Sequence, residues 1–437
     1  MLSHSAMSDL PSSPERLRFD RGTILLDRPV DAPGVRFDAR VGAHRAPAWR
    51  YADLKAEIPV ARRLVDELAP LIERPAGLSP PALRPYQSAA VAAWEGGRRR
   101  GVVVLPPGGG KTHLALAAMA RLGRTTIVLV PTRALLVHWR QHLERAGPTA
   151  GVGVVGDGAQ RLAPITVCTY QSAFERMDLF GDRFGLLVVD EVHNLGRTLR
   201  PEALEMCAAP ARLGLTGTPP TRREALCLLE QLVGPVVSVH RVEELGRHLA
   251  PYDREVVLVR LTAEERRDYA RAYAAHLARA NRALCLGRGP RPGQAELQRA
   301  RRVLAMAAGK LSAAASLLEL HREDRALVFT ADNTAAYRLS RQLLIPAVTC
   351  DIARPEREAL FAALEGGRLR ALVSARVLNE GLDLPDCRVG IVLAGSDGSE
   401  RERQQRLGRL LRPAPGKRAV LYEVLAAGTF EARGRRR

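Results

Sequence analysis

A glycine run followed by lysine is the part of the sequence best suited to chemistry. Residues 106–112 read PPGGGKT, between an apolar stretch and the helix-forming HLALAAM. Consecutive glycines allow backbone N–H groups to turn inward around a phosphate, and the start of the next helix adds a positive field. Only four of the 66 Lys and Arg residues are lysine. Lys111 is one of them, because a compact ammonium fits inside such a loop and the broad arginine fork does not.

This pattern predicts a site for a nucleoside triphosphate. Lys111 would reach the β- and γ-phosphates, and the hydroxyl of Thr112 would ligate Mg²⁺. The common form of the motif also has glycine where this chain has Leu105, and a glycine-rich turn with a chance lysine is the alternative interpretation. The backbone cradle consists of Pro107, Gly108, Gly109 and Gly110.

Two adjacent carboxylates support the triphosphate interpretation. Asp190 and Glu191 end the apolar segment LLVVDE. The first would hold Mg²⁺ through the water shell of the metal, and the second would polarise the attacking water. Acidic pairs also occur in solvated turns, but this pair follows the lysine motif within a series of apolar strands. We therefore predict that it is catalytic.

An arginine pair near the C-terminus completes the predicted chemistry. Arg409 and Arg412 in QQRLGRLLR are three residues apart and so share one helix face. Two guanidiniums presented across a cleft would stabilise charge on a transferring phosphoryl group. In so arginine-rich a chain the spacing alone says little. The prediction depends on the position of the pair in a second α/β unit that follows a complete nucleotide motif.

The charge of the chain indicates an acidic partner. The net charge is +19 and the pI is about 10.6, and nucleic acid bound through its phosphates is the partner that this excess predicts. A genome that favours arginine codons explains arginine over lysine, but not the excess of basic over acidic residues. Aromatic residues make up only 4% of the chain, so we expect contacts with the sugar–phosphate backbone rather than extended base stacking.

The composition argues against several classes of protein. No apolar run is long enough for a membrane span, and residues 1–20 lack the basic and apolar regions of a secretory leader. The 6 cysteines show no CxxC spacing, which argues against a disulfide framework, a zinc site or an iron–sulfur cluster. We therefore expect a cytoplasmic monomer without a membrane partner.

The elements that must position these residues follow the rhythm of an α/β protein. Short strand-like segments separated by Pro and Gly fill residues 15–55, and a helical stretch over 51–73 leads to a Pro-rich hinge. From 83 to 240 apolar strands alternate with amphipathic helices, which indicates a parallel sheet. Residues 262–320 predict helices broken by GRGPRPG, and the α/β rhythm returns after residue 325.

The motifs, taken in order, resemble those of a superfamily 2 DNA helicase of the XPB type, closest to its shorter archaeal-like branch. The resemblance covers residues 83–430, and leucine at position 105 is common in this branch. The β-rich start resembles the damage-recognition domain of the same branch, and VLYEVLAAGTFEARGRRR resembles its C-terminus. Besides the segments quoted above, the resemblance rests on LRPYQSAAV, VLVPTRALLVHW, TVCTYQSA, GLTGTP, ALVFTADN and VSARVLNEGLDLPD.

The resemblance implies an α/β fold of two tandem RecA-like parallel-sheet domains, with a small β-rich N-terminal domain and a helical, thumb-like insertion. ATP and Mg²⁺ would occupy the cleft between the RecA-like domains, and DNA would cross their top. The expected domains are 1–78 (N-terminal, with its helical linker), 79–245 (first RecA-like), 246–322 (connecting strands and insertion) and 323–437 (second RecA-like).

The resemblance also implies further nucleotide-binding residues. Arg84 and Gln87 would recognise the adenine base. Gly381 and Asp383 would approach the nucleotide from the second RecA-like domain.

Other residues would couple the nucleotide site to DNA. His193 would link the acidic pair to Thr216 and Thr218, which would couple hydrolysis to domain motion. Contacts with the DNA backbone would come from Thr132, Arg133, Thr169, Thr330 and Ser374.

The implied activity is that of an ATP-dependent DNA helicase that moves 3′ to 5′ and acts in DNA repair. Two alternatives stay open: a translocase that tracks duplex DNA without separating its strands, and a DNA-binding scaffold with a vestigial ATPase that serves a nuclease partner. Where relatives carry an Arg-Glu-Asp element, this chain has Arg223, Glu224 and Ala225. The missing carboxylate predicts weaker strand opening.

Overall fold

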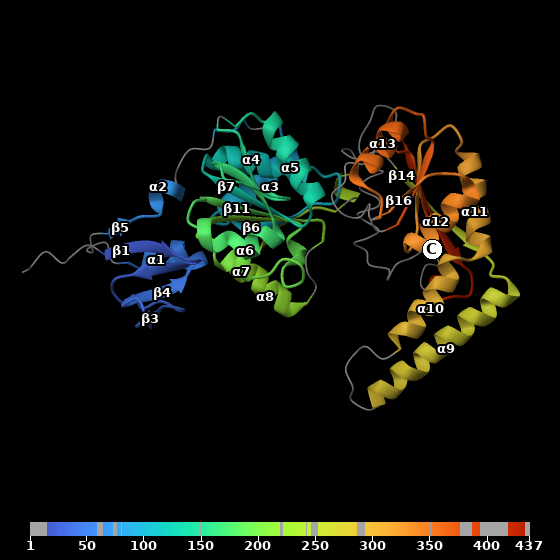
Figure 1. Ribbon diagram of the computed structural model, residues 1–437, viewed down its shortest axis with the longest axis horizontal. Coiled ribbons are helices and arrows are strands. Elements are labelled where there is room, and N and C mark those ends of the chain that lie inside the picture. Colours follow the sequence, from blue (N-terminus) through green and yellow to red (C-terminus); the bar gives the residue numbers. More distant parts are fainter. Residues whose placement is uncertain are drawn as a thin grey trace, which may run out of the picture. The chain divides into compact units, whose positions relative to one another are not determined.

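The computed structural model of the chain divides into two compact units, which are described separately. One comprises residues 1–105 and 110–240, and the other comprises 106–109 and 241–437. Each contains one large sheet flanked by helices, and the first also contains a small N-terminal sheet (Figure 1). The residues that the structure describes are 15–58, 64–72, 77–79, 81–148, 150–218, 222–241, 243–245, 252–285, 293–349, 351–375, 387–393 and 418–432.

The N-terminal sheet is mostly antiparallel and has a core of its own. Leu17, Ile24 and Leu26 are fully buried on one face of it, together with Leu54 of an adjacent helix. Its strands, in the order β3-β4-β2-β1-β5, are β1 (Glu15–Asp20), β2 (Thr23–Leu26), β3 (Arg36–Asp38), β4 (Ala43–Pro47) and β5 (Leu64–Asp66). The accompanying helices are η1 (Ala48–Arg50), α1 (Tyr51–Glu57) and α2 (Ala69–Ile72).

The prediction of a continuous helical stretch over residues 51–73 is wrong. Helix α1 ends at Glu57, and Ile58 is extended, with φ −69° and ψ 122°. Proline disfavours the helical conformation of the residue before it, and Pro59 follows Ile58 directly. Residues 64–66 instead form β5, which pairs in parallel with β1. Pairing with a distant strand has therefore overridden the local helical pattern.

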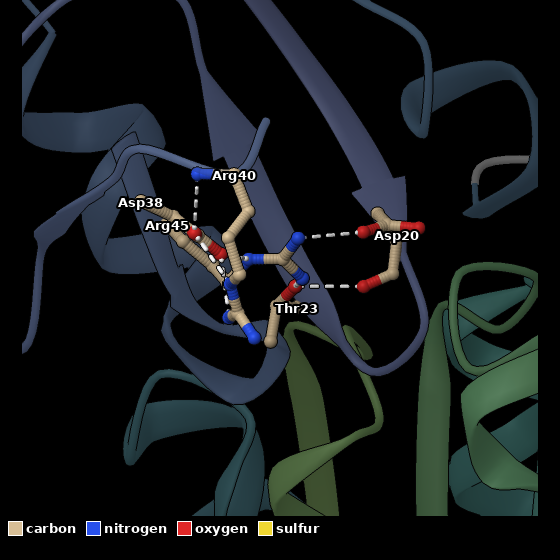
Figure 2. A network of polar contacts seen from close by, with 5 residues as sticks. All are labelled: Asp20, Thr23, Asp38, Arg40 and Arg45. Atoms are coloured by element: carbon tan, nitrogen blue, oxygen red, sulfur yellow. Dashed lines mark hydrogen bonds and ion pairs between the residues drawn. The ribbon is translucent and has the colours of Figure 1, made fainter. Parts of the chain in front are cut away.

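A charged network joins β1, β3 and β4 (Figure 2). Arg45 lies between two carboxylates, with Nη2 2.8 Å from Asp20 Oδ2 and Nε 3.2 Å from Asp38 Oδ2. Arg45 also donates to the hydroxyl of Thr23, and Arg40 donates twice to Asp38. The hydrogen bond from Arg40 lowers the pKa of Asp38 to about 2, against the opposing effect of desolvation. The positive charges of these two arginines are thus balanced within the protein.

The main sheet of the first unit has the order β13-β6-β12-β11-β7-β10-β8-β9 and is parallel except for the β8–β9 hairpin. Its strands are β6 (Arg100–Val104), β7 (Thr126–Val130), β8 (Val152–Gly156), β9 (Ala159–Arg161), β10 (Ile165–Thr169), β11 (Leu186–Asp190), β12 (Ala211–Thr216) and β13 (Val236–Val239). The helices are α3 (Pro85–Gly96), α4 (Lys111–Leu122), α5 (Arg133–Arg145), α6 (Tyr170–Phe180), α7 (Glu202–Glu205) and α8 (Arg223–Leu232).

Two hydrophobic clusters cover the two faces of this sheet. Leu114 and Trp139 belong to one cluster, and Met177 and Leu229 belong to the other. Helices α3, α4 and α5 therefore pack on one face, and α6 and α8 on the opposite face (Figure 1). Strands buried on both faces read as continuous apolar runs, which is why the sequence predicts them. Polar residues end three strands of this sheet: Thr169 ends β10, Asp190 ends β11 and Thr216 ends β12.

A fully buried arginine holds β12 in place. Arg212 donates to the backbone carbonyls of Leu204, Cys207, Ala209 and Leu232. Leu204 and Leu232 lie in the last turns of α7 and α8, where the helix dipole stabilises a cation. Burial lowers the pKa of Arg212 to about 10, so the guanidinium stays charged at neutral pH. The register of β12 is thereby tied to two helices.

The second unit contains one parallel sheet in the order β14-β19-β18-β15-β17-β16. The predicted return of the α/β rhythm is confirmed. The strands are β14 (Tyr252–Val259), β15 (Ala326–Phe329), β16 (Ala347–Val348), β17 (Ala371–Ser374), β18 (Val389–Val392) and β19 (Ala419–Ala426). The helices are α9 (Ala263–Cys285), α10 (Gln294–Ala305), α11 (Ala308–Leu320), α12 (Asn333–Leu343) and α13 (Arg354–Glu365).

The helices predicted for residues 262–320 are α9, α10 and α11. Helices α9 and α10 pack against each other and project from the sheet (Figure 1). The rings of Tyr269 and Tyr273 on α9 stack at 5.5 Å, and Phe430 lies 6.0 Å and 5.6 Å from them. Among the described residues, no single helix has the length and composition of a membrane span. Helices α10 and α11 meet those criteria only as a pair, and that pair is bent by 42°.

Lys310, one of the four lysines, is buried in a polar pair inside the second unit. Its Nζ donates to the carbonyl of Leu393 at 2.6 Å and lies 2.7 Å from Glu431 Oε2. Burial lowers the pKa of the lysine, and Glu431 opposes that shift. The pair connects α11 with the residue that follows β18 and with the segment that follows β19. It gives Lys310 the structural role that the sequence did not reveal.

We predict that Lys310→Met lowers the free energy of unfolding of the second unit by about 3–5 kcal/mol, because the buried carboxylate of Glu431 loses its cation. All 3 tryptophans lie in the first unit, so hydrogen exchange of β14 and β19 is the measurement that reports on the second. The control is the double variant Lys310→Met/Glu431→Leu, which removes both charges and should recover at least half of the loss. If hydrogen exchange of β14 and β19 is unchanged in Lys310→Met, the pairing of Lys310 with Glu431 does not stabilise the second unit.

Candidate active site

The predicted phosphate cradle lies between β6 and α4. Gly108 and Gly110 have φ of +80° and +77°, a region that glycine enters without the steric cost that a Cβ imposes. Gly110 is the N-cap of α4, and the helix begins at Lys111. The first turn of α4 therefore presents its positive end and the lysine side chain at the same place.

Gln87 braces this cradle from the neighbouring helix. Its side chain is buried; Oε1 accepts from the N–H of Arg84 at 2.9 Å, and Nε2 donates to the carbonyl of Gly110 at 3.3 Å. A Cβ at Gly110 would lie 2.2 Å from Gln87 Nε2. Glycine is thus favoured here by its φ, and a Cβ at this position would also displace the amide end of Gln87. The predicted contact of Arg84 and Gln87 with adenine stays a prediction.

The acidic pair lies opposite the lysine. Lys111 Nζ is 3.6 Å from Glu191 Oε1. The indole N–H of Trp139 donates to Asp190 Oδ2 at 2.8 Å, and the backbone N–H of Glu191 donates to Asp190 Oδ1 at 3.0 Å. Both carboxylate oxygens of Asp190 are therefore oriented by donors from the protein, and Glu191 faces the only lysine of the nucleotide motif.

Glu191 has an uncommon backbone conformation. Its φ of 53° and ψ of 47° lie in the left-handed region, which costs about 1–2 kcal/mol for a residue with a Cβ. Such conformations persist where surrounding bonds hold them, and they are concentrated at functional sites. The turn carries the carboxylate of Glu191 away from the line of β11 and towards Lys111.

The electrostatics of the pair favour a bound cation. Burial, followed by the charge of Glu191, raises the pKa of Asp190 to about 6, and Lys111 opposes that rise. A divalent cation would remove the penalty of holding two carboxylates together at low exposure. Thr112 follows Lys111 in the first turn of α4. The chemistry of the residues present suits a triphosphate with its Mg²⁺, and binding of the metal by Thr112 and Asp190 stays a prediction.

The three predicted coupling residues come together beside the acidic pair. His193 Nδ1 lies 2.9 Å from the hydroxyl of Thr216 and 3.3 Å from Glu191 Oε2. The hydroxyl of Thr216 donates to the carbonyl of Thr218 at 2.8 Å. Because that bond uses the only hydroxyl hydrogen of Thr216, His193 Nδ1 must be the donor in its bond to Thr216. A continuous chain of contacts thus runs from Glu191 to the end of β12.

Two of the predicted DNA contacts cap neighbouring helices. The side chain of Thr132 accepts from Leu135 N at the start of α5, and that of Thr169 accepts from Ser172 N at the start of α6. Strands β7 and β10, which precede these helices, are paired in parallel, so the two helix N-termini lie at the same edge of the sheet. The side chain of Arg133 is 78% exposed beside Asp157, at 3.4 Å.

The two predicted DNA contacts of the second unit are buried. Thr330 is 3% exposed and Ser374 is fully buried. The Thr330 hydroxyl lies 3.2 Å from the carbonyl of Asp332 and 3.3 Å from that of Ser374, and the Ser374 hydroxyl donates to the carbonyl of Ala375 at 2.9 Å. The structure brings these residues together at the ends of β15 and β17, but their hydroxyls are used inside the unit. Their contact with DNA stays a prediction.

Comparison with known families assigns three segments of the chain. Residues 81–221 match "Type III restriction enzyme, res subunit", residues 17–59 match "Xeroderma pigmentosum group B helicase damage recognition domain", and residues 309–414 match "Helicase conserved C-terminal domain". A protein named DNA 3'-5' translocase XPB2, from Sulfurisphaera tokodaii, is 34% identical over 444 residues, which cover 96% of this chain and 99% of that relative. The chain belongs to the XPB family of DNA helicases.

Two further relatives are longer than this chain. The DNA 3'-5' helicase XPB of Mycobacterium tuberculosis is 32% identical over 365 residues, which are 80% of this chain and 62% of that protein. The Putative DNA 3'-5' helicase Rad25 of Halobacterium salinarum is 32% identical over 356 residues, which are 80% of this chain and 55% of that protein. The chain thus spans little more than half the length of these two relatives.

Solved structures agree with this assignment at the level of the fold. The helicase domain of Pyrococcus furiosus Hef aligns with a TM-score of 0.52 and 16% identity over 79% of this chain and 96% of its own. Saccharomyces cerevisiae Dbp5 aligns with a TM-score of 0.55 and 14% identity over 78% of this chain and 83% of its own. The predicted family and the α/β fold with RecA-like parallel sheets are therefore confirmed. As a member of the XPB family, the chain is an ATP-dependent DNA helicase or translocase.

Part of the predicted XPB-type site lies outside the described residues. This applies to Gly381, Asp383, Arg409 and Arg412, so their approach to the nucleotide stays a prediction. In the altered Arg-Glu-Asp element, Arg223, Glu224 and Ala225 form the first turn of α8.

Sequence reasoning missed two aromatic residues of this XPB-family site. Trp139 binds the carboxylate of Asp190, and the hydroxyl of Tyr170 donates to the backbone carbonyl of Asp190 and lies 3.2 Å from that of Glu191. Both residues lie within motifs that the sequence had singled out. An apolar ring on a helix face usually signals core packing, so nothing local marked their polar atoms as parts of the site.

We predict that Gly110→Ala raises KM for ATP about tenfold or more, because the added methyl group displaces Gln87 from the cradle. The measurement is steady-state ATP turnover with DNA present. Gly123→Ala at the other end of α4 is the matched control: Gly123 also has a positive φ of +68°, but its Cβ would lie 4.0 Å from the nearest atom. An equal change in KM in both variants would mean that backbone strain, and not Gln87, is responsible.

Proposed function

We propose that the chain couples hydrolysis of Mg²⁺-ATP to 3′-to-5′ movement along DNA, with Lys111, Asp190 and Glu191 as its catalytic residues in the first unit. The observation that carries this proposal is the 3.6 Å approach of Lys111 Nζ to Glu191 Oε1 beside a glycine cradle. A lysine, a strand-end acidic pair and a helix N-terminus at one place match the needs of phosphoryl transfer. The direction is supported by the printed names of the relatives.

Each residue has a separate task in this proposal. Lys111 binds the β- and γ-phosphates, and the backbone of the cradle orients them. When bound, Mg²⁺ supplies positive charge at the phosphate oxygens. Glu191 accepts a hydrogen bond from the attacking water and so polarises it. His193 Nδ1 lies 3.3 Å from Glu191 Oε2 and 2.9 Å from the hydroxyl of Thr216, so His193 connects the position of that carboxylate to that of Thr216.

DNA is bound mainly through its phosphates in this proposal. Thr132 and Thr169 place two helix N-termini at one edge of the sheet, and helix N-termini stabilise anions. The exposed Arg133 adds a guanidinium beside the first of them. The net charge of +19 supports the same interpretation. We also propose that the chain works as a monomer in the cytoplasm.

We predict that Glu191→Gln abolishes ATP turnover but still binds ATP and DNA together, because Lys111 and Asp190 are kept and only water activation is lost. The measurement is a gel-shift or anisotropy assay with ATP beside a turnover assay. Lys111→Ala should instead lose both ATP binding and turnover. Wild-type hydrolysis by Glu191→Gln would show that another residue activates the water, and equally low DNA-dependent turnover in the wild type and Lys111→Ala would favour a vestigial ATPase.

Ala225 offers a test of helicase against translocase activity. We predict that the wild type releases a third strand from a triplex more readily than it separates a forked duplex, because the carboxylate expected at this position is missing. Ala225→Asp should raise strand separation by about three- to tenfold and leave triplex release within about twofold. The helix can accept aspartate, because position 225 lies in the first turn of α8. Unchanged strand separation would dismiss the role given to Ala225.

A further inference from the structure

The two helices with predicted DNA contacts both reach the acidic pair through a buried aromatic residue. Helix α5 is capped by Thr132 and carries Trp139, and helix α6 is capped by Thr169 and begins with Tyr170. Trp139 is fully buried and Tyr170 is 3% exposed. Each aromatic residue directs its polar atom towards Asp190 or its backbone rather than towards solvent. The same arrangement on two neighbouring helices suggests more than core packing.

Tyr170 makes the more direct of the two connections. Its hydroxyl donates to the carbonyl of Asp190 and lies 3.2 Å from the carbonyl of Glu191. These consecutive carbonyls face a single hydroxyl because the backbone of Glu191 is left-handed, with φ 53° and ψ 47°. In a regular strand, successive carbonyls point in opposite directions. The hydrogen bond from the tyrosine hydroxyl therefore depends on the unusual turn, and it also helps to hold that turn.

Hydrogen bonds from two backbone N–H groups also hold this turn. The N–H of Glu191 donates to Asp190 Oδ1 at 3.0 Å, and the N–H of Asn194 donates to the carbonyl of Glu191 at 3.0 Å. Both of these bonds lie within the segment itself. Tyr170 joins the turn to a different element, α6, so movement of that helix changes the position of Glu191.

The connection to the DNA side is covalent and short. Thr169 caps α6: its hydroxyl accepts from Ser172 N at 3.2 Å and donates to Ser172 Oγ at 2.9 Å. Tyr170 is the next residue, so a phosphate bound at this helix N-terminus acts on the backbone that carries the tyrosine. The predicted DNA contact, Thr169, and the residue whose hydroxyl holds the catalytic turn, Tyr170, are therefore adjacent in the chain.

We propose that Tyr170 is a positioning residue that transmits DNA binding at the start of α6 to the carboxylate of Glu191. The inference rests on the proposed function, since it needs hydrolysis at Glu191 and DNA at Thr169. Contact with DNA fixes the N-terminus of α6, the hydroxyl of Tyr170 then fixes the left-handed turn, and Glu191 is held ready to polarise water. Without DNA the turn samples other positions, and hydrolysis is slow.

Tyr170→Phe tests this inference, because it removes only the hydroxyl and keeps the ring in its apolar site. ATP turnover is measured with and without DNA, together with KM for ATP, Kd for DNA and Tm. We expect kcat with DNA to fall about tenfold, and the ratio of stimulated to basal turnover to fall about fivefold or more. KM and Kd should stay close to their wild-type values, because neither the cradle nor the helix cap is changed, whereas Tm should fall modestly because a buried carbonyl loses its donor.

Tyr51→Phe is the matched control. Tyr51 is also 3% exposed, and its hydroxyl lies 2.6 Å from Asp66 Oδ2 in the N-terminal sheet. The Tyr51→Phe variant also loses a buried tyrosine hydroxyl, and it should keep the wild-type ratio of stimulated to basal turnover. If it loses that ratio as Tyr170→Phe does, loss of a buried hydroxyl in general explains the effect and the inference fails.

The remaining outcomes separate this inference from the function on which it rests. An equal fall of turnover with and without DNA would overturn it, because Tyr170 would then hold Glu191 without transmitting anything. A wild-type ratio in Tyr170→Phe would overturn it as well, while the proposed function would stand. If the wild type itself hydrolyses ATP no faster with DNA than without it, the proposed coupling fails and the inference fails with it.

Discussion

A single ammonium facing two adjacent carboxylates is the constraint on which the first unit depends. Asp190 is buried and its pKa is raised to about 6, so its charge is tolerated only with donors and cations nearby. The structure meets this need with elements distant in sequence, Lys111 from α4 and Trp139 from α5, while Tyr170 from α6 holds the backbone of Asp190. A parallel sheet is well suited to this, because the carboxyl ends of its strands and the starts of the following helices meet at one edge.

Local motifs indicated which residues would meet at this edge, and their chemistry stays a prediction. Each of these motifs, the glycine run with Lys111 and the acidic pair, is adjacent in sequence to the strand or helix that positions it. The spacing of the residues is therefore enough to predict what they do. The bond from Tyr170 to Asp190 joins residues 20 positions apart, and that from Trp139 joins residues 51 positions apart. Which buried ring would present a polar atom to the site depends on how the helices pack, and no periodicity in the sequence reports that.

Charge and helical patterns were less reliable guides. A count of basic residues treats Arg212 and Arg45 alike as surface for an acidic partner, but one is buried among carbonyls and the other lies between two aspartates. Lys310 and Glu431 lie 121 positions apart, and nothing local marks either as one half of a buried pair. The helical pattern of residues 51–73 likewise failed where Pro59 and pairing with β1 decided the backbone.

The strand order of the second unit has a consequence for synthesis on the ribosome. Among the described residues of this unit, β14 is the first strand in the chain, but it pairs with β19, the last, and β19 also pairs with β18. An emerging β14 therefore waits for nearly the whole unit before it finds its neighbour, and such non-local pairing is slow. Its exposed Val256 and Leu258 would meanwhile be open to wrong partners. Nascent chains stalled just before residue 418 should for this reason engage chaperones more than chains released after residue 432.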